Sequence, residues 1–123
     1  MLDLKTNATK IKITNEHEVF KDTEYANSEF YVEMKNLSTG EQMQNMRKNT
    51  HVENGTEIQD TYGLTVDQLV SSVTDWGGIG SDGKEIKCTP ENVRAIFNYS
   101  QEFAGLLIEA YAKEFFEKDD KKK

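Results

Sequence analysis

Residues 75–97 read DWGGIGSDGKEIKCTPENVRAIF, and this stretch decides how the second half of the chain folds. It holds the only Trp, the only Pro, the only Cys and four of the eight Gly of the protein. Gly77 and Gly78 are expected to end a helix, because Gly readily takes the left-handed backbone found at helix ends. The tetrapeptide SDGK at residues 81–84 predicts a small hairpin or a tight loop. We therefore interpret the stretch as a rigid joint between helices.

Apolar residues at helical spacing flank this joint on both sides. Thr65 is expected to cap the preceding helix, whose apolar face carries Val66, Leu69, Val70, Val73 and Trp76. Thr89 caps the following helix, with Pro90 at the first helical position, where a missing N–H costs nothing. Ser100 opens a final helix whose apolar residues are Phe103, Leu106, Leu107, Ala110, Tyr111 and Phe115.

The N-terminal half carries weaker signals. Ile11 and Ile13 alternate with polar residues, and residues 30–35 alternate in the same way, so each segment predicts a short strand. Ser38 followed by Glu41 matches a capping box, which predicts a helix over residues 39–48. The Asn-Gly pair at residues 54–55 is expected to lie in a polar loop.

These elements predict an α+β fold. The C-terminal two-thirds are expected to be mainly helical, with about four helices, and the β element to be short and N-terminal. Residues 1–29 are interpreted as an N-terminal extension with one candidate strand, residues 30–118 as a single globular domain, and residues 119–123 as a charged, disordered tail.

Composition narrows the classes of partner. The chain has 123 residues and a net charge of -7, with 22 acidic and 15 basic residues. This balance argues against general binding of nucleic acid and against docking on an anionic membrane. One cysteine precludes an internal disulfide, and no apolar run approaches the roughly 18 residues of a membrane span. We expect a soluble protein of a reducing cytosol.

Residues that carry chemistry are sparse, so we predict no enzymatic activity, no metal and no cofactor. His17 and His51 are far apart in the sequence and lack further ligands at zinc spacing. The GGIG run at residues 77–80 lacks the Gly-Lys-Ser/Thr ending of a phosphate-binding loop. Cys88 precedes a helix, whose dipole would lower the pKa of its thiol. A small enzyme using Cys88 or a pair of carboxylates therefore stays as an alternative.

The joint resembles phage tail assembly chaperones. The shared pattern runs from a Trp through an Asp-Gly turn to a Thr-Pro-Glu-Asn helix start. It is carried by Trp76, Gly78, Ile79, Asp82, Gly83, Lys84, Ile86, Thr89, Pro90, Glu91, Asn92 and Val93. The resemblance covers about residues 30–116 and is sharpest over residues 64–97. The chain departs from the family at residues 99–101, where relatives often have a proline, and residues 1–29 match nothing in the pattern.

The resemblance implies a function in assembly. Such chaperones bind the long helical tape measure protein in the bacterial cytoplasm, keep it soluble, help to recruit tail tube protein and leave before the virion matures. The final helix is the expected contact, through Leu107, Ile108, Tyr111, Phe115 and Phe116, which are more apolar residues than one buried stripe needs. These residues could instead serve the core or a homo-oligomer. The second candidate function is another phage structural component, such as a head–tail connector or a tail completion protein.

Overall fold

Three antiparallel strands from distant parts of the sequence form the central sheet. They are β1 (Lys10–Thr14), β2 (Tyr31–Lys35) and β5 (Val73–Gly77), with β2 in the middle. The computed structural model describes residues 1–4 and 9–117. Within these residues the helices are α1 (Thr39–Lys48), α2 (Thr61–Ser72), α3 (Pro90–Tyr99) and α4 (Gln101–Ala112), and the shorter turns are η1 (Glu18–Phe20), η2 (Glu24–Asn27) and η3 (Lys113–Glu117).

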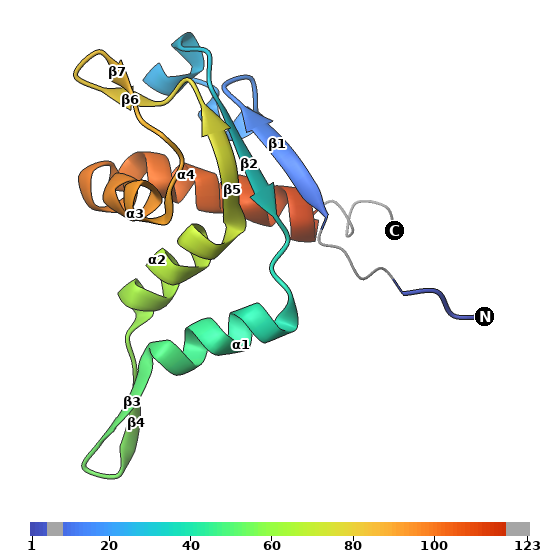
Figure 1. Cartoon of the computed structure of the whole chain (residues 1–123), viewed down its shortest axis with the longest axis vertical. Coiled ribbons are helices and arrows are strands. Elements are labelled where there is room, and N and C mark those ends of the chain that lie inside the picture. Colours follow the sequence, from blue (N-terminus) through green and yellow to red (C-terminus); the bar gives the residue numbers. More distant parts are fainter. Residues whose placement is uncertain (5–8, 118–123) are drawn as a thin grey trace.

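The core lies between one face of this sheet and α4, which runs across it (Figure 1). Val32 of β2 is paired with a residue of β1 on one side and with Trp76 of β5 on the other, and it is completely buried. Leu107 of α4 belongs to the same buried cluster. Alternation along β2 thus turns one face to α4 and the other to solvent.

The N-terminal residues belong to this core. β1 completes the sheet, and Phe20 of η1 packs against Phe30 and Phe103, with ring centroids 5.1 and 5.8 Å apart. The sequence predicts that residues 1–29 form an extension. In the structure, two elements of that range, β1 and η1 with its Phe20, share one core with residues 30–110. The predicted tail, residues 119–123, lies outside the described residues.

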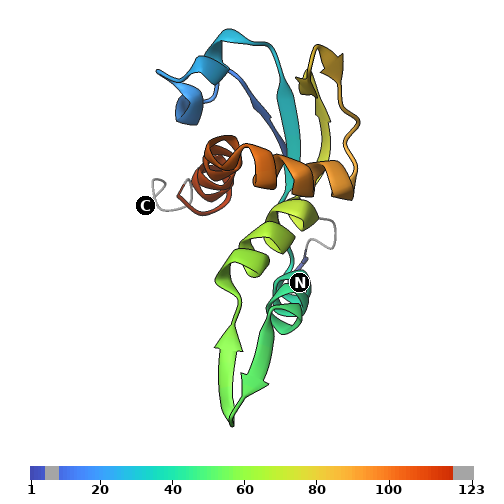
Figure 2. The same ribbon diagram turned by 90° about the vertical axis from the view of Figure 1, so that its left-hand side faces the viewer.

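The expected distribution of strands is wrong. The chain is an α+β mix with strands spread along it, rather than a mainly helical C-terminal part with one short N-terminal β element. After α1 come a hairpin of β3 (Thr50–Glu53) and β4 (Thr56–Gln59), then β5, then a second hairpin of β6 (Gly80–Ser81) and β7 (Lys84–Glu85). The first hairpin projects away from the central sheet (Figures 1 and 2). Its turn is the Asn-Gly pair, with φ of 51° and 78° at the two residues, so the predicted loop is a hairpin turn.

Trp76 lies on a strand, not on the predicted helix. Asp60 caps α2, which begins four residues before the predicted cap and ends at Ser72. In β5, Val73 and Trp76 are both buried although they are three residues apart, because the pairing with β2 shifts by one residue at Thr74. The hydroxyl of Thr74 donates to the Glu33 carboxylate over 2.7 Å at this bulge. Because of the bulge, the buried residues of this strand are three positions apart, which is the spacing expected on one face of a helix.

The predicted joint between two helices is wrong, because α2 ends at Ser72 and Gly77 belongs to β5 rather than to a helix end. The stretch links β5 to α3, and its predicted turn and helix start are confirmed. Asp82 and Gly83 have φ of 53° and 77° and turn the second hairpin. The indole N–H of Trp76 donates to the Ile86 carbonyl over 2.7 Å, which ties this hairpin to the sheet. Thr89 caps α3 by accepting from the Asn92 N–H. The predicted capping box of Ser38 and Glu41 is also present, at the start of α1. None of the helices in the described ranges is long and apolar enough to span a membrane.

Gly78 should be the least replaceable glycine of the joint. Its φ is +75°, and a Cβ atom there would clash with the backbone of Glu29, whereas Gly83 has φ of +77° and open space around it. We expect Gly78→Ala to lower the free energy of unfolding by at least about 2 kcal/mol and Gly83→Ala by about 1 kcal/mol, because only the first adds a clash to backbone strain. Urea unfolding of both variants measures the difference. Equal losses would show that the contact with Glu29 is unimportant.

Candidate functional site

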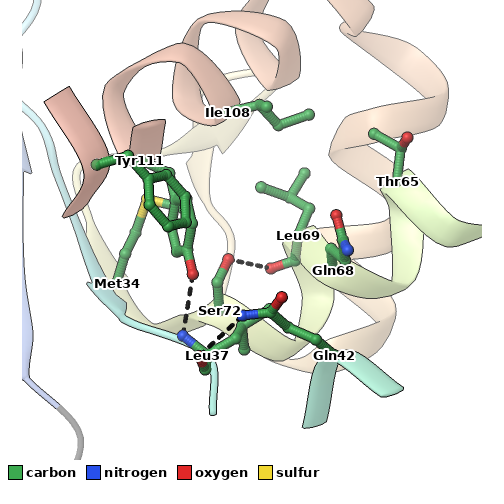
Figure 3. Close-up of a pocket in the computed structure, with 10 residues that line it drawn as sticks. Met34, Leu37, Gln42, Thr65, Gln68, Leu69, Ser72, Ile108 and Tyr111 are labelled. Atoms are coloured by element: carbon green, nitrogen blue, oxygen red, sulfur yellow. Dashed lines mark hydrogen bonds between the residues drawn. The ribbon is translucent and has the colours of Figure 1, made fainter. Parts of the chain in front are cut away.

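An apolar pocket of about 200 Å³ opens among α1, α2 and α4 (Figure 3). We call it the α4 groove. Its lining residues are Met34, Leu37, Gln42, Thr65, Gln68, Leu69, Ser72, Ile108, Tyr111 and Phe116. They come from three separate parts of the chain, residues 34–42, 65–72 and 108–116, so only the fold brings them together.

The groove has an apolar floor and an uncharged polar rim. Met34 extends from the inner face of β2, while Leu69 and Ile108 approach from α2 and α4 (Figure 3). Gln42 and Gln68 lie at the rim, and none of the ten lining residues carries a charge. Such a lining favours an apolar side chain and offers no charged partner to a phosphate or a carboxylate.

Tyr111 joins α4 to the segment that precedes α1. Its hydroxyl accepts from the Leu37 N–H over 2.9 Å and donates to Asn36 Oδ1 over 3.1 Å. Both capacities of the hydroxyl are thereby used, and the ring stands against the groove (Figure 3). Tyr111 is therefore a structural link as well as a lining residue.

The wall formed by α1 and α2 is held by polar contacts. The buried residue of α1 is a polar one, Asn45, whose amide donates to Ser71 Oγ over 3.2 Å. The Asn49 amide donates to Asp67 over 2.8 Å, and the Arg94 guanidinium of α3 donates to the other oxygen of Asp67 over 2.9 Å. Hydrogen-bond geometry, rather than apolar burial, sets the position of α1 against α2.

Asp67 is the ionisable centre of this wall. Partial burial works to raise the pKa of its carboxyl, but the hydrogen bonds from Asn49 and Arg94 and the charge of Arg94 outweigh burial and hold the pKa below its ordinary value. The carboxylate form is thus preferred in the folded state. Asp67 is placed to fix α1, α2 and α3 together, and it lies outside the lining of the groove.

The predicted contact residues divide into three groups. Ile108, Tyr111 and Phe116 line the groove. Phe115 packs on the ring of Tyr111, with centroids 4.8 Å apart. Leu107 is only 1% exposed and belongs to the core, which is the alternative role that the sequence left open for these residues. Helical periodicity alone does not tell which of Leu107 and Ile108 faces the core. The position of the sheet decides that Leu107 does and that Ile108 faces the groove.

Seven lining residues were not predicted as a site. They are Met34, Leu37, Gln42, Thr65, Gln68, Leu69 and Ser72. Leu69 and Met34 were identified only as members of apolar faces. The motif residues of the joint, from Trp76 to Asn92, contribute none of the lining, so the patterned stretch and the groove are separate features.

The surroundings of Cys88 disfavour the thiolate form of its side chain. Burial, and then the charge of Asp75, raise the pKa of the half-buried thiol, which opposes the lowering expected from a helix start. The two histidines each contact a carboxylate. His17 Nε2 lies 3.0 Å from Glu114 Oε1, and His51 Nε2 lies 3.5 Å from Glu53 Oε1. Across residues 1–4 and 9–117, no group of three or more His, Cys, Asp or Glu side chains is placed to hold a metal ion.

The size of the groove limits what it can hold. Pockets for drug-sized ligands span about 300–1,000 Å³, whereas this one offers about 200 Å³. It suits one or two apolar side chains of a larger partner. Comparison with family models, curated proteins and solved structures finds no match to this chain.

Tyr111→Phe tests the link between α4 and α1. The change keeps the ring but leaves the buried Leu37 N–H without its acceptor, so we expect a loss of about 1–2 kcal/mol in the free energy of unfolding. Tyr99→Phe on the exposed end of α3 is the matched control and should change little. Guanidinium unfolding of the two variants compares them, and equal stability would exclude a role for the Tyr111 hydroxyl.

Asp67→Asn tests the polar wall through its pH dependence. The pKa of the Asp67 carboxyl is lower in the folded than in the unfolded protein. Its carboxylate therefore contributes its full stabilisation at pH values above the unfolded pKa, and this contribution is lost as the pH falls through the folded pKa. We expect the variant to lose about 1 kcal/mol at pH 7 and the difference from wild type to shrink below about pH 4. Glu109→Gln, an exposed residue of α4, controls for the loss of one negative charge. A deficit that persists unchanged at pH 2.5 would contradict this assignment.

Proposed function

We propose that this chain is a phage or prophage tail assembly chaperone, which binds the tape measure protein, keeps it soluble and assists assembly of the tail tube. The α4 groove is the observation that carries the proposal. It presents an apolar floor at the surface, bounded by helices on both sides, and an unassembled helical protein has apolar stripes that need such cover. The pattern of residues 64–97 agrees with this role.

The groove suits a helix better than an extended strand. A helix presents apolar side chains at intervals of three and four residues, which place one or two of them in a small pocket while the rest of the helix lies along α2 and α4. The amide of Gln68 at the rim can hydrogen-bond the polar side chains that flank such a stripe, whereas the amide of Gln42 already donates to the Leu37 carbonyl over 3.2 Å.

The charge of the chaperone favours a basic partner. With a net charge of -7, the protein attracts positively charged segments and repels its own copies. We propose that the tape measure segment carries Lys or Arg beside its apolar stripe. In this proposal the protein acts in the cytoplasm of the bacterial host, also meets the tail tube protein, and is absent from mature particles.

Co-expression tests this function. The long, helical open reading frame beside the gene is expressed with and without the chain, and the soluble fraction and co-purification are measured. We expect that neighbour to be soluble only in co-expression. Insolubility in both cases would reject the proposal, and recovery of the chain in purified particles would instead favour a connector or a tail completion protein.

A pair of matched variants assigns the contact to the groove. Gln68→Arg places a charge at the rim, and we expect at least about a tenfold loss of affinity for the tape measure protein, because the charge must be desolvated against an apolar partner. Gln44→Arg adds the same charge to the exposed side of α1, about 200° round the helix from Gln42. Isothermal titration with the purified partner should show normal binding for this control. Equal binding by both variants would place the contact elsewhere.

A further inference from the structure

Helix α1 has its apolar residues on the outside, whereas a surface helix normally turns them to the core. Its buried residue is Asn45, and its two methionines, Met43 and Met46, are 48% and 46% exposed. At about 100° per residue, both methionines lie more than about 90° round the axis from Asn45. Arg47 follows Met43 by four positions, so it lies beside the methionines, and it is exposed as well. The outer face of α1 is therefore apolar and basic, although the net charge of the chain is -7.

The hairpin of β3 and β4 follows α1 directly, and we call residues 50–59 the arm. It projects away from the central sheet (Figures 1 and 2), and every strand residue except Thr50 is exposed. The Thr50 hydroxyl donates to the Met46 carbonyl over 2.7 Å, and the Asp60 N–H donates to the Asn49 carbonyl over 2.6 Å. The base of the arm is thus attached to the end of α1. The strands beyond it need cover from another surface, because an isolated two-stranded hairpin is only marginally stable in water.

One side of the arm is apolar and acidic. Val52 and Glu57 are directly opposite each other in the register, so their side chains point to the same side, and Val52 is 66% exposed. Glu53 lies on the other side, where His51 is 3.5 Å away. The ion pairs formed within the described ranges of the chain include neither Glu57 nor Arg47. These two opposite charges are therefore available to a second molecule.

We infer that the arm of one copy of this chain packs on the outer face of α1 of a second copy. Val52 lies against Met43 and Met46, and the Glu57 carboxylate pairs with the Arg47 guanidinium. A four-residue strand is about 13 Å long and the ten-residue α1 is about 15 Å long, so the arm matches the length of the helix. Because each chain has both an arm and an α1, the contact forms twice about a two-fold axis.

The charges select this contact among those that two copies could make. A net charge of -7 on each copy opposes the approach of most of their surfaces. The outer face of α1 offers an acidic arm both a positive charge and apolar cover. The inference stands apart from the proposed function, since neither the arm nor Met43, Met46 and Arg47 line the α4 groove.

A charge exchange in the full chain tests the contact. Arg47→Glu sets a negative charge opposite Glu57 of the second copy, and Glu57→Arg sets a positive charge opposite its Arg47. We expect sedimentation equilibrium to show that each change raises the dissociation constant of the dimer at least about tenfold. An equimolar mixture of the two variants should associate about as tightly as wild type, because each chain supplies the charge that the other needs.

The matched control is Glu91→Arg, at an exposed position of α3. It gives the same net charge as Glu57→Arg, and it should associate no more weakly than wild type. A wild-type chain that stays monomeric at about 1 mM would overturn the inference. Wild-type association by both charge variants would also overturn it, as would a mixture that associates no better than each variant alone, because the charges would then not meet between two copies.

Discussion

The burial of β2 beneath α4 is the constraint on which the rest of the structure depends. β2 pairs with β1, about twenty residues earlier, and with β5, about forty residues later, and its inner residues Val32 and Met34 are enclosed by the helix. A shift of β2 by one residue would turn this face to solvent, so the register is fixed by the core. Met34 also forms part of the groove floor, and the site is therefore an extension of the same packing.

The two sides of the groove are built differently. The α4 side is continuous with the apolar core, whereas α1 is attached to α2 through Asn45, Asn49 and Asp67. Polar contacts of this kind define one geometry but add less stability than apolar burial of the same area. The α1 side of the groove is therefore held less strongly than the α4 side.

Local signals predicted the elements that depend on neighbouring residues. The capping box at Ser38, the turn at Asp82 and the helix start at Thr89 all appear in the structure because each requires contacts only three or four residues apart. The sequence pattern predicts a helix over β5 because the bulge of this strand places Val73 and Trp76 on one face, three residues apart. The partner strand that produces the bulge lies forty residues away, and no local pattern reports it.

The groove shows the same division between local and distant causes. The sequence by itself determined that the final helix has more apolar residues than one stripe requires, because its period and composition depend on that segment alone. Only the tertiary structure decided that Leu107 enters the core while Ile108 faces the groove, and that Phe116 joins it through a π turn. Side-chain period fixes relative directions round a helix, but which direction points to the sheet is set by packing between distant segments.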